Sequence, residues 1–162
     1  MWKRWIVLSG AWMVLAPAGL PQENTRAVSG PDAIAARQAA MDLCVIAVRS
    51  IEGAMKAGAE AKSQGFAAAV LAKWAKALPG MFPPGTGKGE TSANTQALAA
   101  IWKDRAGFDQ AAANYVAATA RLASLAGTND TAGFTKQLEE VNQACNSCHT
   151  RYKESGANPH GK

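Results

Sequence analysis

Apolar residues recur every three or four positions between residues 31 and 155, which is the period of an α-helix that buries one face. The first such pattern predicts a helix from Pro31 to about Lys56. Its apolar stripe consists of Ile34, Met41, Val48 and Met55 at intervals of seven residues, with Cys44, Val45 and Ile51 in the complementary positions. We therefore expect one face of this helix to pack against a core.

The second pattern predicts a helix from about Ser63 to Leu78. The residues expected on its core face are Phe66, Val70, Trp74 and Leu78. Pro79 and Gly80 end it, because neither residue favours continuation of a helix. The stretch 83–96 is rich in Gly, Pro, Thr and Ser, and we expect it to form a surface loop between two helices.

Two further helices are expected, from about Lys103 to Ala126 and from the turn at 127–130 to about Ser155. Their apolar stripes are Phe108, Tyr115 and Leu122 in the third helix, and Phe134, Leu138, Val141, Cys145, Cys148 and Tyr152 in the fourth. Four amphipathic helices with two short turns and one longer loop predict an all-α fold. The expected architecture is an antiparallel up-down four-helix bundle with a cofactor between facing helices.

The composition agrees with this fold class. Hydrophobic residues make up 48% of the 162 positions and aromatic residues only 7%, and the β-branched and aromatic runs of an all-β fold are missing. The formal charge of +5 falls to +3 without Lys3 and Arg4, which gives no support for nucleic-acid binding.

We expect one domain over 31–155, preceded by a flexible segment over 19–30 and followed by a disordered tail over 156–162.

The first 18 residues have the three parts of a cleaved secretory signal peptide. The basic pair Lys3-Arg4 precedes an apolar run from Trp5 to Leu15, and Ala16-Pro17-Ala18 offers a small-residue cleavage site. The apolar run is too short to cross a bilayer as a helix. We therefore expect a soluble, exported, periplasmic protein without a membrane anchor.

Export places the three cysteines in an oxidising compartment, where paired thiols normally form disulfides. Cys145 and Cys148 are followed directly by His149, which gives the C-x-x-C-H motif of covalent haem attachment. The alternatives are a disulfide, a thioredoxin-like pair, which would need a βαβ pattern, and half of a zinc site. Zinc would need a second pair of ligands, and only Cys44 and His160 remain. We interpret the motif as the attachment site of one haem c.

The spacing of this motif suits haem chemistry. Each thiol can add to one vinyl group of the porphyrin, and Cys145 and Cys148, three residues apart on a helix, present both sulfurs to one edge of the ring. His149 lies one turn beyond Cys145, so its imidazole can bind the iron as the proximal ligand. These three residues are expected to act as one unit.

The ligand on the opposite side of the iron decides what such a haem does. His160 follows His149 by only eleven residues, beyond a Gly and a Pro, so coordination by two histidines is not expected. Met41 is the better candidate, because it lies midway along the first helix on the core stripe and a thioether is a known haem ligand. The alternative is that Met41 only packs against the ring. The sequence leaves both open.

Two further residues on this stripe have chemical interest. Arg37 lies one turn before Met41, and we expect it to bind a haem propionate, because a core-directed arginine needs an anion or an exit to water. The alternative is that it extends into solvent. Cys44 is expected to be a buried thiol that packs as a small hydrophobe, and the alternative is an exposed thiol that cross-links two chains.

From about Pro31 to Lys153, the chain resembles the cytochrome c prime family, the class II c-type cytochromes. The resemblance rests on the haem motif at the end of the last helix and on segments earlier in the chain. These segments are Arg37-Gln38-Ala39-Ala40-Met41, Leu78-Pro79 with Phe82-Pro83-Pro84-Gly85-Thr86, and Ile101-Trp102 with Phe108.

The resemblance implies thioethers at Cys145 and Cys148, a proximal ligand at His149 and a distal ligand at Met41. Some members of the family are low-spin electron carriers with a distal Met, whereas others leave the iron five-coordinate and high-spin and bind NO or CO. Many members have Arg where this chain has Lys153, and Cys44 is not part of the family pattern.

We therefore expect a periplasmic monohaem cytochrome that transfers single electrons to and from redox partner proteins, and not an enzyme, so that no catalytic residues are named. The alternative is a five-coordinate, high-spin cytochrome that binds NO or CO. A third interpretation is a redox-inert, secreted helical domain without haem. By analogy with relatives, a homodimer would form through the first two helices.

Overall fold

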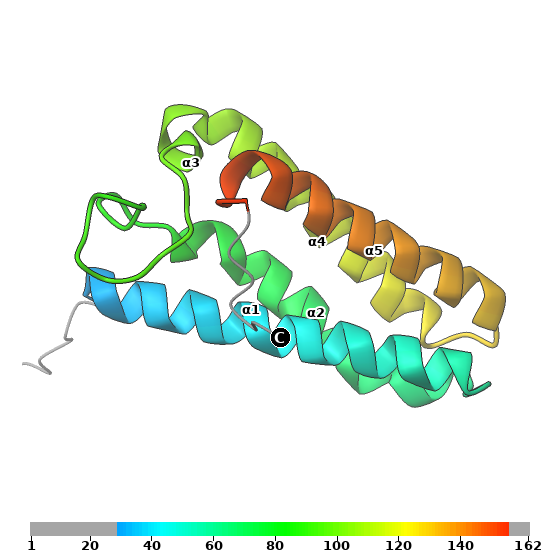
Figure 1. The fold of residues 1–162 in the computed structure, drawn as a ribbon. Helices are drawn as coiled ribbons and strands as arrows, with labels where there is room; N and C mark the ends of the chain where they lie inside the picture. The colour runs from blue at the N-terminus through cyan, green and yellow to red at the C-terminus, as the bar shows by residue number, and fades with distance from the viewer. Residues whose placement is uncertain (1–28, 156–162) are drawn as a thin grey trace, which may run out of the picture.

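The computed structural model describes residues 29–155, and this part of the chain folds into helices joined by turns and one long segment (Figure 1). The four long helices are α1 (Gly30–Lys56), α2 (Gly65–Ala77), α4 (Arg105–Leu125) and α5 (Thr131–Tyr152). They form an antiparallel four-helix bundle, which confirms the predicted fold class. The predicted signal peptide, most of the flexible segment and the tail lie outside the described residues.

The bundle consists of two antiparallel helix pairs, α1 with α2 and α4 with α5 (Figure 1). α4 packs along both α5 and α2, whereas α1 and α5 touch over a much shorter length. Within the described range, no helix is long and apolar enough to span a bilayer. The limited contact between α1 and α5 matters for the site, because these two helices carry the candidate iron ligands.

The second helix is shorter than predicted and buries a different face. Short 3₁₀-helices flank α2, η1 (Ala61–Gln64) before it and η2 (Leu78–Met81) after it. Phe66 is 84% exposed and Val70 is 38% exposed, so the predicted core face is wrong for these two positions. The buried residues of α2 are Ala68, Leu71 and Ala75. Because α2 is apolar on both sides, periodicity could not decide which side faces α4, and small alanine side chains allow closer approach.

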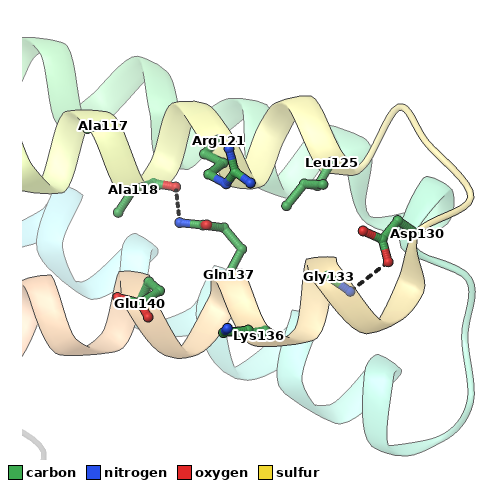
Figure 2. A pocket seen from close by; sticks show the side chains of 9 residues that line it. All are labelled: Ala117, Ala118, Arg121, Leu125, Asp130, Gly133, Lys136, Gln137 and Glu140. Carbon is green, nitrogen blue, oxygen red and sulfur yellow. Dashed lines mark hydrogen bonds between the residues drawn. The ribbon is translucent and has the colours of Figure 1, made fainter.

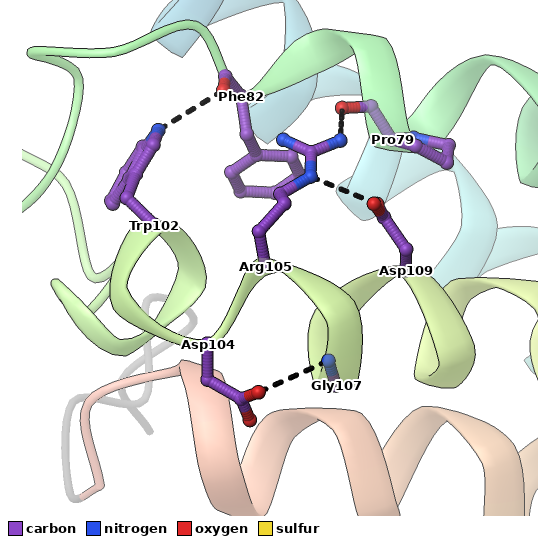
Figure 3. Close-up of polar contacts among 7 residues, drawn as sticks. All are labelled: Pro79, Phe82, Trp102, Asp104, Arg105, Gly107 and Asp109. Carbon is purple, nitrogen blue, oxygen red and sulfur yellow. Dashed lines mark hydrogen bonds and ion pairs between the residues drawn. The ribbon is translucent and has the colours of Figure 1, made fainter.

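The third predicted helix is interrupted near its start. A single turn, α3 (Ala100–Lys103), ends at Asp104, whose φ of −119° and ψ of 58° leave the helical region. The Asp104 carboxylate then accepts a hydrogen bond from the Gly107 backbone N–H at 3.1 Å and caps the start of α4 (Figure 3). Asp130 caps α5 in the same way by accepting from the Gly133 N–H at 2.8 Å. The chain direction therefore changes at Asp104 before the long helix begins.

The packed core runs along the whole bundle, from the end where α1 meets α2 and α4 meets α5 to Ile101 and Phe108 at the opposite end. Its fully buried side chains include Ile51, Leu71, Leu122, Phe134 and Val141. At the opposite end, the long segment between η2 and α3 folds over the bundle, and the last turns of α5 lie beside it (Figure 1). The haem motif lies at this second end.

Candidate haem site

The C-x-x-C-H motif lies in the last two turns of α5. Cys145 and Cys148 are half-buried and pack against the hydrophobic core, as their place in the apolar stripe predicts. His149 is adjacent and exposed. No disulfide joins any of the three cysteines, all of which lie within the described residues. Two thiols and an imidazole are thus presented from one stretch of one helix.

The surroundings of these groups favour their neutral forms. Burial raises the pKa of the Cys145 thiol to about 11, and the nearby thiols of Cys44 and Cys148 contribute further. Burial also raises the pKa of Cys148. Although much of the His149 side chain is exposed, partial desolvation and the positive charge of Lys153 lower its pKa, which favours the neutral imidazole. A neutral imidazole is the form that binds a metal.

Cys44 faces this site from α1. Its Sγ lies 3.9 Å from the hydroxyl oxygen of Tyr115 on α4, which donates a weak hydrogen bond to it. Burial raises the pKa of the thiol. Cys44 is half-buried and packs against the core, in agreement with its interpretation as a small hydrophobe. Tyr115 is buried, and its pKa is raised mainly by burial.

Met41 lies one turn before Cys44 on α1, is half-buried and packs against the same core. It is therefore on the inward side of the helix that faces α5 over a short length. These observations are compatible with both interpretations of Met41, as an iron ligand and as packing against the ring. Its coordination remains a prediction.

Arg37 is only 3% exposed, but its partners belong to the segment that follows α2. One terminal nitrogen donates to the Thr86 hydroxyl at 2.8 Å and to the Met81 carbonyl at 3.4 Å. The other donates to the Thr86 carbonyl at 2.6 Å and to the Thr95 hydroxyl at 2.7 Å. The guanidinium also lies 4.6 Å from the centre of the Phe82 ring. Arg37 thus holds this segment against α1, and binding a propionate would require it to exchange a partner.

Trp74 provides a test of whether the described residues fit a haem. Its indole N–H is buried and has no hydrogen-bond partner among residues 29–155. A buried donor is normally paired, and an acceptor such as a propionate carboxylate would satisfy it. Trp74 lies near the end of α2 that points towards the same end of the bundle as the haem motif (Figure 1). Half-buried thiols, a neutral imidazole and an unpaired buried donor together suit a flat apolar group with acidic edges.

The family profile described as Cytochrome C' matches residues 32–153. The chain belongs to the cytochrome c' family. Members of this family carry one covalently attached haem c, so the chain is a monohaem c-type cytochrome. It is 40% identical over 73 residues to a cytochrome c' of Rubrivivax gelatinosus, a match that covers 45% of this chain and 54% of the relative. The chain thus spans about half the length of the curated relatives it matches.

Solved structures of cytochromes c' share the fold. The crystal structure of cytochrome c' from Rubrivivax gelatinosus aligns with a TM-score of 0.69 at 31% identity, covering 77% of this chain and 97% of that one. A nitric oxide complex of a mutant cytochrome c prime from Alcaligenes xylosoxidans aligns with a TM-score of 0.69 at 23% identity, covering 78% of this chain and 98% of that one. The latter likeness supports the fold alone.

Several contacts at this end of the bundle were not predicted from the sequence. Phe108 and Tyr152 are buried as expected, with ring centres 5.4 Å apart in an edge-to-face arrangement. The spacing of apolar residues does not predict the hydrogen bond that Tyr152 donates to Asp104, nor those that Arg37 donates to the long segment. They depend on where a loop and a helix break are placed in space, and local patterns do not encode that placement.

Proposed function

We propose that the haem is attached to α5 through thioethers at Cys145 and Cys148, with His149 as the proximal iron ligand. The observation that carries this proposal is the placement of the two half-buried thiols one turn apart on α5, directly before the imidazole of His149. The attached haem supplies one-electron redox chemistry. The chain contributes the attachment points, one axial ligand and an apolar surrounding.

The proposed function is single-electron transfer in the periplasm between redox partner proteins, with Met41 as the distal ligand. Support comes from the inward position of Met41 on α1, opposite the helix that carries His149. A thioether and an imidazole together form a ligand pair known for electron-carrying cytochromes. We propose no catalytic residues and no enzymatic reaction.

A second candidate function is the binding of NO or CO at a five-coordinate iron. The supporting observation is that a mutant of cytochrome c prime from Alcaligenes xylosoxidans, similar in fold, has been solved as a nitric oxide complex. In this case Met41 would pack against the ring without binding the iron, and its apolar side chain would offer no hydrogen bond to a ligand.

The absorption spectrum of the ferric protein separates these functions. With Met41 as ligand, the wild type is low-spin, and Met41→Ala converts it to high-spin. Met55→Ala, a half-buried methionine fourteen residues further along α1, is the matched control and leaves the spectrum unchanged. A high-spin wild type whose ferrous spectrum shifts on adding CO would instead establish the second function.

A homodimer through α1 and α2 is also proposed. These neighbouring helices carry exposed apolar side chains that a monomer leaves in water: Leu43 at 63%, Ile46 at 63% and Phe66 at 84% exposure. We expect Phe66→Asp to shift the sedimentation coefficient from that of a dimer to that of a monomer. An unchanged oligomeric state in this variant contradicts the proposed interface.

A further inference from the structure

The imidazole of His149 has no hydrogen-bond partner within residues 29–155. Metal-binding histidines usually donate their second ring N–H to a carboxylate, carbonyl or water, and that bond fixes the orientation of the ring. The only neighbouring charge that affects His149 is the cation of Lys153, which cannot accept a hydrogen bond. Among the described protein groups, what directs this ring is therefore the backbone that carries it.

That backbone is the last turn of α5, and the Asp104 carboxylate holds it from one side. Asp104 accepts a hydrogen bond from the Tyr152 hydroxyl at 2.9 Å and one from the Arg151 guanidinium at 2.8 Å. Tyr152 is 3% exposed and lies edge-to-face on Phe108, so its ring has little freedom to move. Tyr152 follows His149 by three residues, which places it on the same side of the helix, one turn later.

The segment before α3 holds the same turn from another side. The Leu98 backbone N–H donates to the Tyr152 carbonyl at 3.0 Å, and the Glu154 N–H donates to the Gln96 carbonyl at 2.9 Å. Ala97 and Lys153 form an isolated antiparallel bridge at this point. Backbone hydrogen bonds to residues 96–98 thus hold residues 152–154, which follow directly on the helical turn that begins at His149.

Asp104 joins these contacts to the start of α4. The same carboxylate that receives Tyr152 and Arg151 also caps α4 through the Gly107 N–H at 3.1 Å (Figure 3). A Cβ atom at Gly107 would overlap a carboxylate oxygen of Asp104 and would lie 2.7 Å from the Tyr152 hydroxyl oxygen. The three groups are therefore packed without spare room. The hydrogen bond from Tyr152, followed by that from Gly107, lowers the pKa of Asp104, so the carboxylate is charged at neutral pH.

We propose that Asp104 is a positioning residue for the iron ligand His149. By holding Tyr152 and Arg151, it fixes the last turn of α5 and thereby the direction of the His149 imidazole. This inference rests on the proposed attachment of haem at Cys145, Cys148 and His149. It assigns to a surface carboxylate on another helix the orienting role that a direct hydrogen bond to the imidazole usually has.

The test compares Asp104→Ala and Tyr152→Phe with the matched control Asp130→Ala. Asp130 caps α5 at the far end of the bundle through the Gly133 N–H (Figure 2), but it has no hydrogen bond to the last turn of α5. Tyr152→Phe keeps the ring against Phe108 and removes only the hydroxyl. The readouts are the hyperfine-shifted proton resonances of the His149 ring in the ferric holoprotein, and hydrogen exchange of the Lys153 amide, which donates to the His149 carbonyl at 3.1 Å.

We expect Asp104→Ala and Tyr152→Phe to shift the His149 resonances and to accelerate exchange of the Lys153 amide about tenfold, a change typical of losing one hydrogen bond to a charged group. Asp130→Ala lowers global stability without shifting these resonances. Unchanged resonances in both test variants overturn the proposal and leave Asp104 as a helix cap only. An intact mass without haem for the wild type overturns the proposed function as well, which distinguishes the two failures.

Discussion

The two ends of this bundle are held together in different ways. Where α1 meets α2 and α4 meets α5, the interior is filled by fully buried apolar side chains such as Ile51, Leu122 and Phe134. At the other end, residues of mixed chemistry are half-buried, including Cys44, Cys145 and Cys148. Hydrogen bonds through Arg37 and Asp104 hold the surrounding segments in place there. The first end is held mainly by buried apolar side chains, whereas the second combines buried rings such as Phe108 and Tyr152 with polar contacts between segments and the half-buried thiols of the haem motif.

The largest expected effect comes from removing the attachment points. In the Cys145→Ser, Cys148→Ser double variant we expect complete loss of covalent haem, because no thiol of the motif remains to form a thioether. Hydrogen exchange is expected to show loss of protection in the last turns of α5, while amides near Leu122 and Phe134 stay protected. Equal loss of protection at both ends would contradict the independence of the packed end.

Phe134→Ala tests the packed end directly. Phe134 is 0% exposed, and removing a fully buried phenylalanine side chain destabilises a protein by about 3–5 kcal/mol. The measurement is the free energy of unfolding from urea titration, with the haem spectrum of the folded protein expected to stay unchanged. Phe66→Ala, measured at protein concentrations where the chain is monomeric, is the matched control, because Phe66 is 84% exposed in the chain and its loss changes stability by only about 0.5 kcal/mol or less. Similar losses of unfolding free energy in both variants would contradict the burial of Phe134 in the core.

Gly107→Ala tests how tightly the cofactor end is packed. The added methyl group would overlap a carboxylate oxygen of Asp104, which its hydrogen bonds hold in place, so we expect a loss of about 1–3 kcal/mol in the free energy of unfolding. Gly53→Ala on α1 is the control, since its Cβ meets nothing within 4 Å and alanine in a helix stabilises by roughly 0.5–1 kcal/mol. The same sign of change in both variants would argue against the close contact at Gly107.

The smallest effect is a pH dependence that Asp104 contributes. Its pKa is lowered in the folded state, first by the Tyr152 hydroxyl, so its contribution to stability is full above the unfolded-state pKa of about 3.9 and is lost as pH falls through the lower folded-state value. We expect the stability difference between wild type and Asp104→Asn to shrink below about pH 4. A difference that grows on acidification has the wrong sign for this carboxylate.

The helical periodicity was sufficient to predict the four long helices and the bundle, because each helix buries one face. It failed on the orientation of α2, where Phe66 was expected inside and is exposed, since a helix that is apolar on both sides does not specify its buried face. The haem motif was recognisable because its chemistry lies in five consecutive residues. In contrast, the contacts of Asp104 with Tyr152 and of Arg37 with Thr86 join residues 48 and 49 positions apart, and no local pattern predicts such pairs.

The central claim is that one haem is bound covalently through Cys145 and Cys148. Intact mass spectrometry of the exported protein, produced in a host that attaches haem to c-type cytochromes, tests it most directly. The account predicts the polypeptide mass plus one haem, retained after denaturation and extraction with acidified organic solvent. It also predicts the polypeptide mass alone for the double cysteine variant. The mass of the bare polypeptide for the wild-type protein would contradict it.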